Sequence, residues 1–109
     1  LAEANLRSLE LPTACHAGDV GAWLQPGLGG PSDVVVLDPP RAGLEPPVAE
    51  VLQHCGAGAL VLMGCDGASF CRDVKRLAPR WRLERLAVLD FFPNTHHVEC
   101  LGLLRPSAS

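Results

Sequence analysis

The chain has 109 residues, of which 48% are hydrophobic, so it can bury one core but offers too little sequence for two domains. Its formal net charge of −3 speaks against an autonomous RNA-binding module, because such modules usually carry a basic face. The five cysteines lack C-x-x-C spacing, which argues against a zinc ribbon or disulfide framework and favours the reducing cytoplasm, and no apolar run reaches the ~20 residues of a membrane helix.

The first third of the chain carries weak signals. Residues 1–8 indicate the end of a helix, residues 13–17 a short strand and residues 20–24 a brief helix, before a connection rich in Pro and Gly at 25–32. Because the chain starts with Leu1 instead of Met, within what reads as a helix, we expect it to be a fragment of a longer protein.

From residue 33 onwards strands and helices alternate clearly. Strands are expected at 33–38, 59–64, 82–92 and 98–104, and helices at 45–54 and 68–77. The run at 33–38 holds three consecutive β-branched residues followed by Leu37 and is bounded by Asp at both ends, which is typical of a strand buried on both faces of a parallel sheet. Residues 106–109 are expected to form a tail.

This order of elements predicts an α/β fold with a mostly parallel open sheet and right-handed crossovers. In such sheets ligands bind beyond the carboxyl ends of the strands. Asp38, the Cys65 loop and the segment after Phe92 are therefore expected at one functional edge.

Asp38 ends a strand and is followed by two prolines, which hold its carboxylate in a rigid turn. For an isolated Asp-Pro-Pro the commoner explanation is a turn that ends the strand and caps a helix. Both interpretations stay open at this point.

Cys65 lies between a buried strand and the start of a helix. A helix N-terminus favours a thiolate, whereas the negative charge of Asp66 disfavours it, so the sequence does not fix the net effect. An inert buried thiol is the commoner alternative. It is the interpretation that we give to the other cysteines, Cys15, Cys55, Cys71 and Cys100.

The third candidate is Glu99, at the end of the segment Phe-Pro-Asn-Thr-His-His-Val-Glu. His96 and His97 suggest a metal site, but adjacent residues of a strand point to opposite faces and no further ligand has a recognised spacing. We therefore predict no metal and expect Glu99 to act as a general base. Six basic residues within 72–85 could contact RNA, although a solvated helix face is the commoner explanation.

Three blocks together resemble the RNA 5-methyluridine methyltransferase family, whose members act on transfer or ribosomal RNA. They are D-P-P-R-A-G at 38–43, G-C-D-G-x-x-x-x-R-D at 64–73 and F-P-N-T-H-H-V-E at 92–99, and their order and spacing agree with the family across nearly the whole chain. The resemblance implies a Rossmann-like class I fold that uses S-adenosylmethionine (SAM). Residues 1–109 would then be the C-terminal part of one catalytic domain, whose first strands and Gly-rich SAM loop are not included.

The resemblance also implies roles for four residues. Cys65 would be the nucleophile and Glu99 the proton acceptor, Asp38 would contact SAM, and Asp19 would lie near its adenine end. Uracil C5 becomes nucleophilic only after a thiolate adds at C6, so the RNA uridine would have to be flipped out of its stack.

Two departures from the family pattern lie next to the nucleophile. Asp66 stands where the family usually has Asn, and Gly67 stands where it has a Pro that stiffens the loop. We expect the isolated chain to bind SAM poorly and not to turn over.

Two alternatives remain. A methyltransferase acting on another acceptor would leave Cys65 and Glu99 without a role, and amino-group methyltransferases usually carry an aromatic residue where Arg41 stands. The second alternative is a noncatalytic remnant that contacts RNA or protein. Neither the choice between transfer and ribosomal RNA nor the oligomeric state follows from the sequence.

Overall fold

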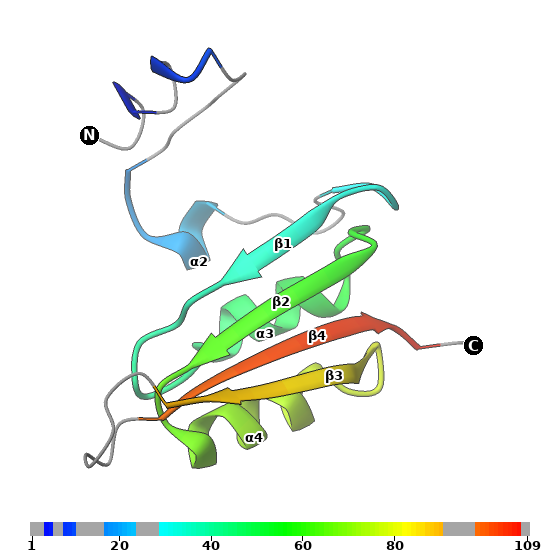
Figure 1. Cartoon of the computed structure of the whole chain (residues 1–109). Coiled ribbons are helices and arrows are strands. Elements are labelled where there is room, and N and C mark those ends of the chain that lie inside the picture. The colour runs from blue at the N-terminus through cyan, green and yellow to red at the C-terminus, as the bar shows by residue number, and fades with distance from the viewer. Residues whose placement is uncertain (1–3, 6–7, 11–16, 24–28, 91–97, 108–109) are drawn as a thin grey trace.

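The computed structural model describes residues 4–5, 8–10, 17–23, 29–90 and 98–107. These residues form a four-stranded sheet with helices on one face, as Figure 1 shows. The strands are β1 (Val34–Leu37), β2 (Ala59–Gly64), β3 (Trp81–Leu89) and β4 (Glu99–Pro106), and the helices are α2 (Val20–Trp23), α3 (Pro46–Gln53) and α4 (Gly67–Leu77). The predicted α/β class is confirmed.

The N-terminal predictions are tested only in part. Residues 4, 5 and 8 are helical, as expected, and α2 matches the helix expected at 20–24. The strand expected at 13–17 lies outside the described residues, apart from Ala17, which is not in a strand.

The strand order is β1-β2-β4-β3. β1 and β2 pair in parallel, and β4 pairs antiparallel with both β2 and β3. β1, β2 and β3 therefore run in one direction, and β4 runs against them from its place between β2 and β3. Because the connection at 90–98 is short, β4 folds back beside β3, which is the usual arrangement for consecutive antiparallel strands.

The two long helices begin where the sequence provides suitable residues. Pro46 and Pro47 stand in the first turn of α3, where a missing backbone N–H costs nothing. Asp66 caps α4, since its carboxylate accepts hydrogen bonds from the backbone N–H groups of Ala68 at 3.0 Å and Ser69 at 3.5 Å.

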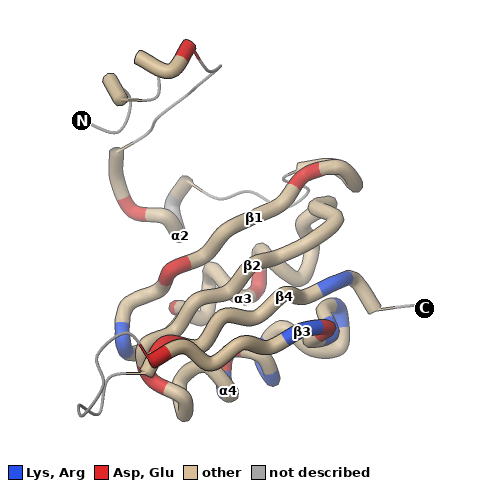
Figure 2. Tube along the Cα trace, viewed as in Figure 1, with Lys and Arg blue, Asp and Glu red and all other residues tan. Residues whose placement is uncertain are grey.

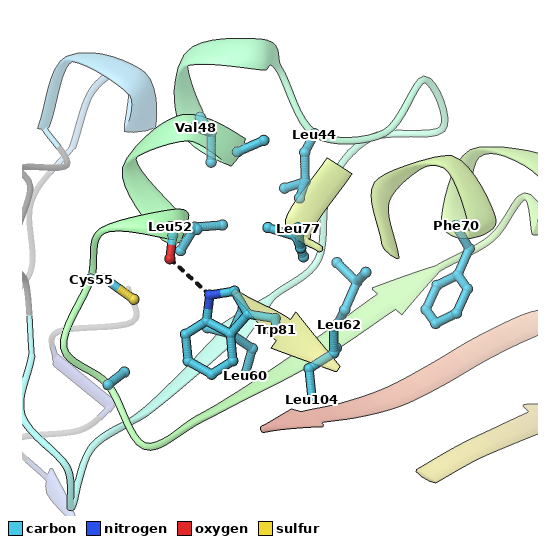
Figure 3. Packing of buried hydrophobic residues seen from close by; sticks show 12 residues of the cluster. Leu44, Val48, Leu52, Cys55, Leu60, Leu62, Phe70, Leu77, Trp81 and Leu104 are labelled. Atoms are coloured by element: carbon cyan, nitrogen blue, oxygen red, sulfur yellow. Dashed lines mark hydrogen bonds between the residues drawn. The ribbon is translucent and has the colours of Figure 1, made fainter. Parts of the chain in front are cut away.

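The core lies between these helices and one face of the sheet (Figure 3). Its largest fully buried side chain is Trp81, whose indole N–H donates a hydrogen bond of 2.8 Å to the carbonyl oxygen of Leu52 in α3. The other core side chains include Leu44, Val48, Leu60, Leu62, Phe70, Leu77 and Leu104. Because the indole N–H of Trp81 has this hydrogen-bond partner, its burial does not carry the cost of an unpaired polar group.

Three predictions were wrong. Cys71 was expected to be a buried thiol, but it lies on the exposed side of α4. The strand at 33–38 is not buried on both faces: Val35 and Leu37 pack against the core, whereas Val34 and Val36 are 57% and 65% exposed. The reason is that α3 and α4 lie on the same face of the sheet (Figure 1). The tail does not start at residue 106, because Pro106 ends β4 and pairs with Trp81.

Candidate active site

The predicted residues meet at one edge of the sheet because of the strand register. Gly64 at the end of β2 pairs with Cys100 in β4, so Cys65 directly follows this pair and Glu99 directly precedes it. On the other side of β2, Leu37 pairs with Leu62, and Asp38 follows Leu37. The register therefore brings Asp38, Cys65 and Glu99 to the same edge on three adjacent strands.

Cys65 is exposed in the short connection between β2 and α4. Its neighbour Asp66 is engaged on both sides: Oδ1 caps α4, and Oδ2 lies 3.9 Å from Nε of Arg41. The thiol is thus accessible to a large substrate, and the charge of Asp66 is shared between a helix terminus and a guanidinium group.

Glu99 is the first residue of β4 and is partly buried. Burial raises the pKa of the neighbouring Cys100 thiol, and the charges of Cys71 and Glu99 raise that pKa further. These effects favour the neutral form of the Cys100 thiol, which lies next to Glu99 in β4. His96 and His97 lie outside the described residues.

A pocket of about 440 Å³ brings the two predicted cofactor residues together. Asp19 borders it from the segment before α2, and Asp38 borders it from the end of β1. Its remaining lining residues are Gly18, Val20, Val36, Leu37, Pro39, Pro40, Gly43, Leu44, Glu45 and Val48. Apolar walls with a few carboxylates are typical of small-molecule sites.

Within the part of the chain that the structure describes, no three His, Cys, Asp or Glu side chains gather as metal ligands would. None of the described helices has the length and hydrophobicity needed to cross a membrane.

The basic residues of 72–85 do not form one surface at the candidate site. Lys and Arg gather near the start of β3 and the end of β4, at the edge of the sheet opposite to Cys65 (Figure 2). Arg72 and Arg76 instead donate hydrogen bonds to the backbone carbonyls of Ala42 and Leu44.

Sequence reasoning missed the importance of Asp73. Asp73 was not among the predicted site residues, yet Phe70, Asp73 and Leu77 are all buried in α4. The signal was present in the spacing, because positions three and four apart share one face of a helix and Asp73 lies between two apolar residues of that face.

Comparison with solved structures identifies a methyltransferase that shares this fold. The solved structure of the tRNA (uracil-54, C5)-methyltransferase of Pyrococcus abyssi, in complex with S-adenosyl-L-homocysteine, superposes with a TM-score of 0.78 at 32% identity, covering 94% of this chain and 24% of that one. The chain therefore has the fold of part of a Rossmann-like methyltransferase domain.

The family is defined by sequence as well. Residues 31–106 match the tRNA (uracil-5-)-methyltransferase family, and the chain belongs to this family. An uncharacterised RNA methyltransferase of Parasynechococcus marenigrum is 42% identical over 109 residues, covering 97% of this chain and 23% of the relative. The P. abyssi tRNA (uracil(54)-C(5))-methyltransferase is 42% identical over 72 residues, covering 66% of this chain and 17% of the relative. The chain thus spans about a quarter or less of these relatives.

Proposed function

We propose that the protein containing this chain methylates C5 of a uridine in transfer or ribosomal RNA, with Cys65 as nucleophile and Glu99 as proton acceptor. The observation that carries the proposal is the β2–β4 register, which brings an exposed thiol and a carboxylate to neighbouring positions at one sheet edge. Membership of the uracil-5-methyltransferase family supports the choice of substrate.

The chemistry balances with these two side chains. The Cys65 thiolate forms a bond to uracil C6, and the electron pair of the C5–C6 double bond moves towards O4, which makes C5 nucleophilic. After C5 has gained the methyl group, Glu99 accepts the C5 proton. The C5–C6 double bond then re-forms and the thiolate leaves. A stacked base hides C6, so the uridine has to be flipped out.

SAM, when bound, would supply the methyl group, and its sulfonium sulfur would keep the electron pair of the broken S–CH3 bond, so that S-adenosyl-L-homocysteine would be the leaving group. The pocket bordered by Asp19 and Asp38 fits such a cofactor, because its apolar walls suit an adenine ring and its carboxylates can accept hydrogen bonds from hydroxyl and amino groups. The cysteines Cys55, Cys65, Cys71 and Cys100 are free, which agrees with a cytoplasmic setting in which the nucleophile stays reduced.

We also propose that residues 1–109 belong to a single catalytic domain whose other parts cover the outer face of the sheet. In the described structure that face carries Val34, Val36, Val61 and Leu103 without a covering helix. A doubly wound sheet normally has helices on both faces. The isolated chain is therefore expected to show weak SAM binding and no RNA methylation, and activity of the isolated chain would contradict this proposal.

The test is a trapping experiment with the full-length protein, SAM and RNA containing 5-fluorouridine. Fluorine at C5 cannot leave as a proton, so the covalent adduct should persist and be found on Cys65 by mass spectrometry. Cys65→Ser should abolish it, whereas Cys71→Ser, which removes another exposed thiol, should retain it. No adduct with either transfer or ribosomal RNA would favour another methyl acceptor or a noncatalytic role.

Glu99→Gln provides a second test with natural RNA. This variant should still form the bond between Cys65 and C6, but it should accumulate the methylated adduct because nothing removes the C5 proton. Normal turnover by Glu99→Gln would assign the base to another residue.

A further inference from the structure

Asp73 is the one charged side chain that is buried among the described residues, with 1% of its surface exposed. It lies in the middle of α4, on the face that also carries Phe70 and Leu77. Burying a carboxylate is costly unless other groups compensate its charge. The groups around Asp73 therefore indicate what this position does.

The carboxylate of Asp73 lies directly against the backbone of the loop after β1. Oδ2 accepts a hydrogen bond of 3.0 Å from the backbone N–H of Leu44. A Cβ atom at Gly43, which has a φ of +92°, would lie 2.8 and 2.9 Å from the two carboxylate oxygens. Only glycine permits both this backbone conformation and this close approach.

Two arginines of α4 also bind the loop after β1 and complete the attachment of this loop to the helix. Arg72 donates from Nη2 to the carbonyl oxygen of Ala42, and Arg76 donates from Nη1 to that of Leu44 at 3.0 Å. Nη1 of Arg76 also lies 4.0 Å from Oδ1 of Asp73, an oxygen that has no hydrogen-bond donor among the described residues. Residues 42–44 are thus held by little more than one turn of α4.

The same helix also fixes the loop that carries the proposed nucleophile. α4 begins at Gly67, two residues after Cys65, while the attached loop begins at Asp38. A second link joins the two loops, since Nε of Arg41 lies 3.9 Å from Oδ2 of Asp66. α4 is therefore a rigid connection between the edge of the cofactor pocket and Cys65.

We propose that Asp73 is a positioning residue that, through residues 42–44, sets the separation between the pocket at Asp38 and the thiol of Cys65. This inference rests on the proposed function, in which methyl donor and nucleophile act on one base. It assigns Asp73 no contact with substrate. Small errors in such a separation slow a reaction strongly, by on the order of 100-fold for 1 Å.

The test uses Asp73→Asn in the full-length protein. Asn keeps the shape and one acceptor for the Leu44 N–H, but it removes the charge that faces Arg76. Single-turnover methyl transfer should fall by about 10-fold or more, while RNA affinity and the alkylation rate of Cys65 stay within about twofold of wild type. A loss of general structure would change all three quantities together.

Asp33→Asn is the matched control. Asp33 also accepts a backbone hydrogen bond, of 2.7 Å from Gly30 N–H, but it precedes β1 at the opposite edge of the sheet. The single-turnover rate of methyl transfer by Asp33→Asn should stay within about twofold of the wild-type rate. If Asp73→Asn does not fold, Arg72→Gln replaces an exposed residue of the same attachment and should slow methyl transfer several-fold.

Three results would overturn the inference: a folded Asp73→Asn protein with the wild-type methyl-transfer rate, an equal loss in Asp33→Asn, or a parallel loss of Cys65 alkylation. Failure of the proposed function would look different, because wild type itself would then methylate neither transfer nor ribosomal RNA.

Discussion

The substitution Gly102→Ala tests how tightly the sheet packs beside the candidate site. A Cβ at position 102 in β4 would lie 2.8 Å from Cζ of Phe70 and 3.0 Å from Cδ1 of Leu83. Carbon atoms in good contact are about 3.5–4.0 Å apart, so the ring would have to retreat by roughly 0.7 Å. It has little room, since the same ring lies against Gly64, where a Cβ would be 3.1 Å from Cδ2.

The net effect follows from two opposing contributions. Overpacking of this kind costs about 1–3 kcal/mol, whereas replacing Gly by Ala within a regular element gains about 0.5–1 kcal/mol. Taking the middle of both ranges, we expect Gly102→Ala to lower the free energy of local opening by about 1 kcal/mol, equivalent to roughly 5-fold faster hydrogen exchange of the β4 amides.

The assay is hydrogen exchange of the full-length protein, followed by mass spectrometry. Gly67→Ala is the control, because a Cβ at Gly67 meets no atom within 4 Å, and it should leave exchange in β4 unchanged. Phe70→Leu, which shortens the obstructing side chain, should reduce the penalty of Gly102→Ala. Unchanged exchange in Gly102→Ala, or strictly additive effects of the two substitutions, would refute the packing argument.

Three further predictions concern single groups. Asp66→Ala removes the acceptor for Ala68 N–H and should lower the free energy of unfolding by about 1 kcal/mol, whereas Asp66→Asn should keep the cap, as chemical denaturation would show. Trp81→Phe removes the 2.8 Å hydrogen bond to the Leu52 carbonyl oxygen, which keeps the 3.4 Å bond from the Cys55 N–H, and should cost about 0.5–1.5 kcal/mol in the same assay. Because its raised pKa keeps the Cys100 thiol protonated, alkylation of Cys100 at about pH 8.5 should be slower than that of cysteine in a peptide and should rise as pH increases further; equal rates would contradict the burial argument.

Local sequence signals predicted the elements well where they were strong. The strand at 59–64 was predicted with its observed bounds, and the helices at 45–54 and 68–77 differ from α3 and α4 by one residue at their ends. Apolar periodicity and clear stop signals act within a few residues, so they can be read from one sequence. The rule for strand ends likewise placed Asp38 and Cys65 at a common edge before any register was known.

What the sequence did not reveal depends on distant contacts. The place of β4 between β2 and β3 is set by pairing across the sheet, for which a single sequence carries no signal. The burial of Asp73 depends on a loop about 30 residues earlier, whose Gly43 leaves space for the carboxylate. The spacing places Asp73 on the apolar face of its helix, but charged residues are seldom buried, and the groups that compensate the burial of Asp73 become visible only in three dimensions.

The structure also makes the second departure from the family pattern testable, because position 67 is well suited to proline. Gly67 is the first residue of α4, where proline needs no N–H partner, and a Cβ there meets nothing within 4 Å. The preceding Asp66, at φ −129° and ψ 115°, already has the extended conformation that proline imposes on its neighbour. Gly67→Pro should therefore stabilise the full-length protein by about 0.4–1 kcal/mol through a less flexible unfolded chain. Since the same change stiffens the connection that follows Cys65, methyl transfer should become faster and not slower. Thermal unfolding and single-turnover kinetics measure the two effects separately, and a destabilised or slower Gly67→Pro protein would show that the loop needs the freedom that glycine provides.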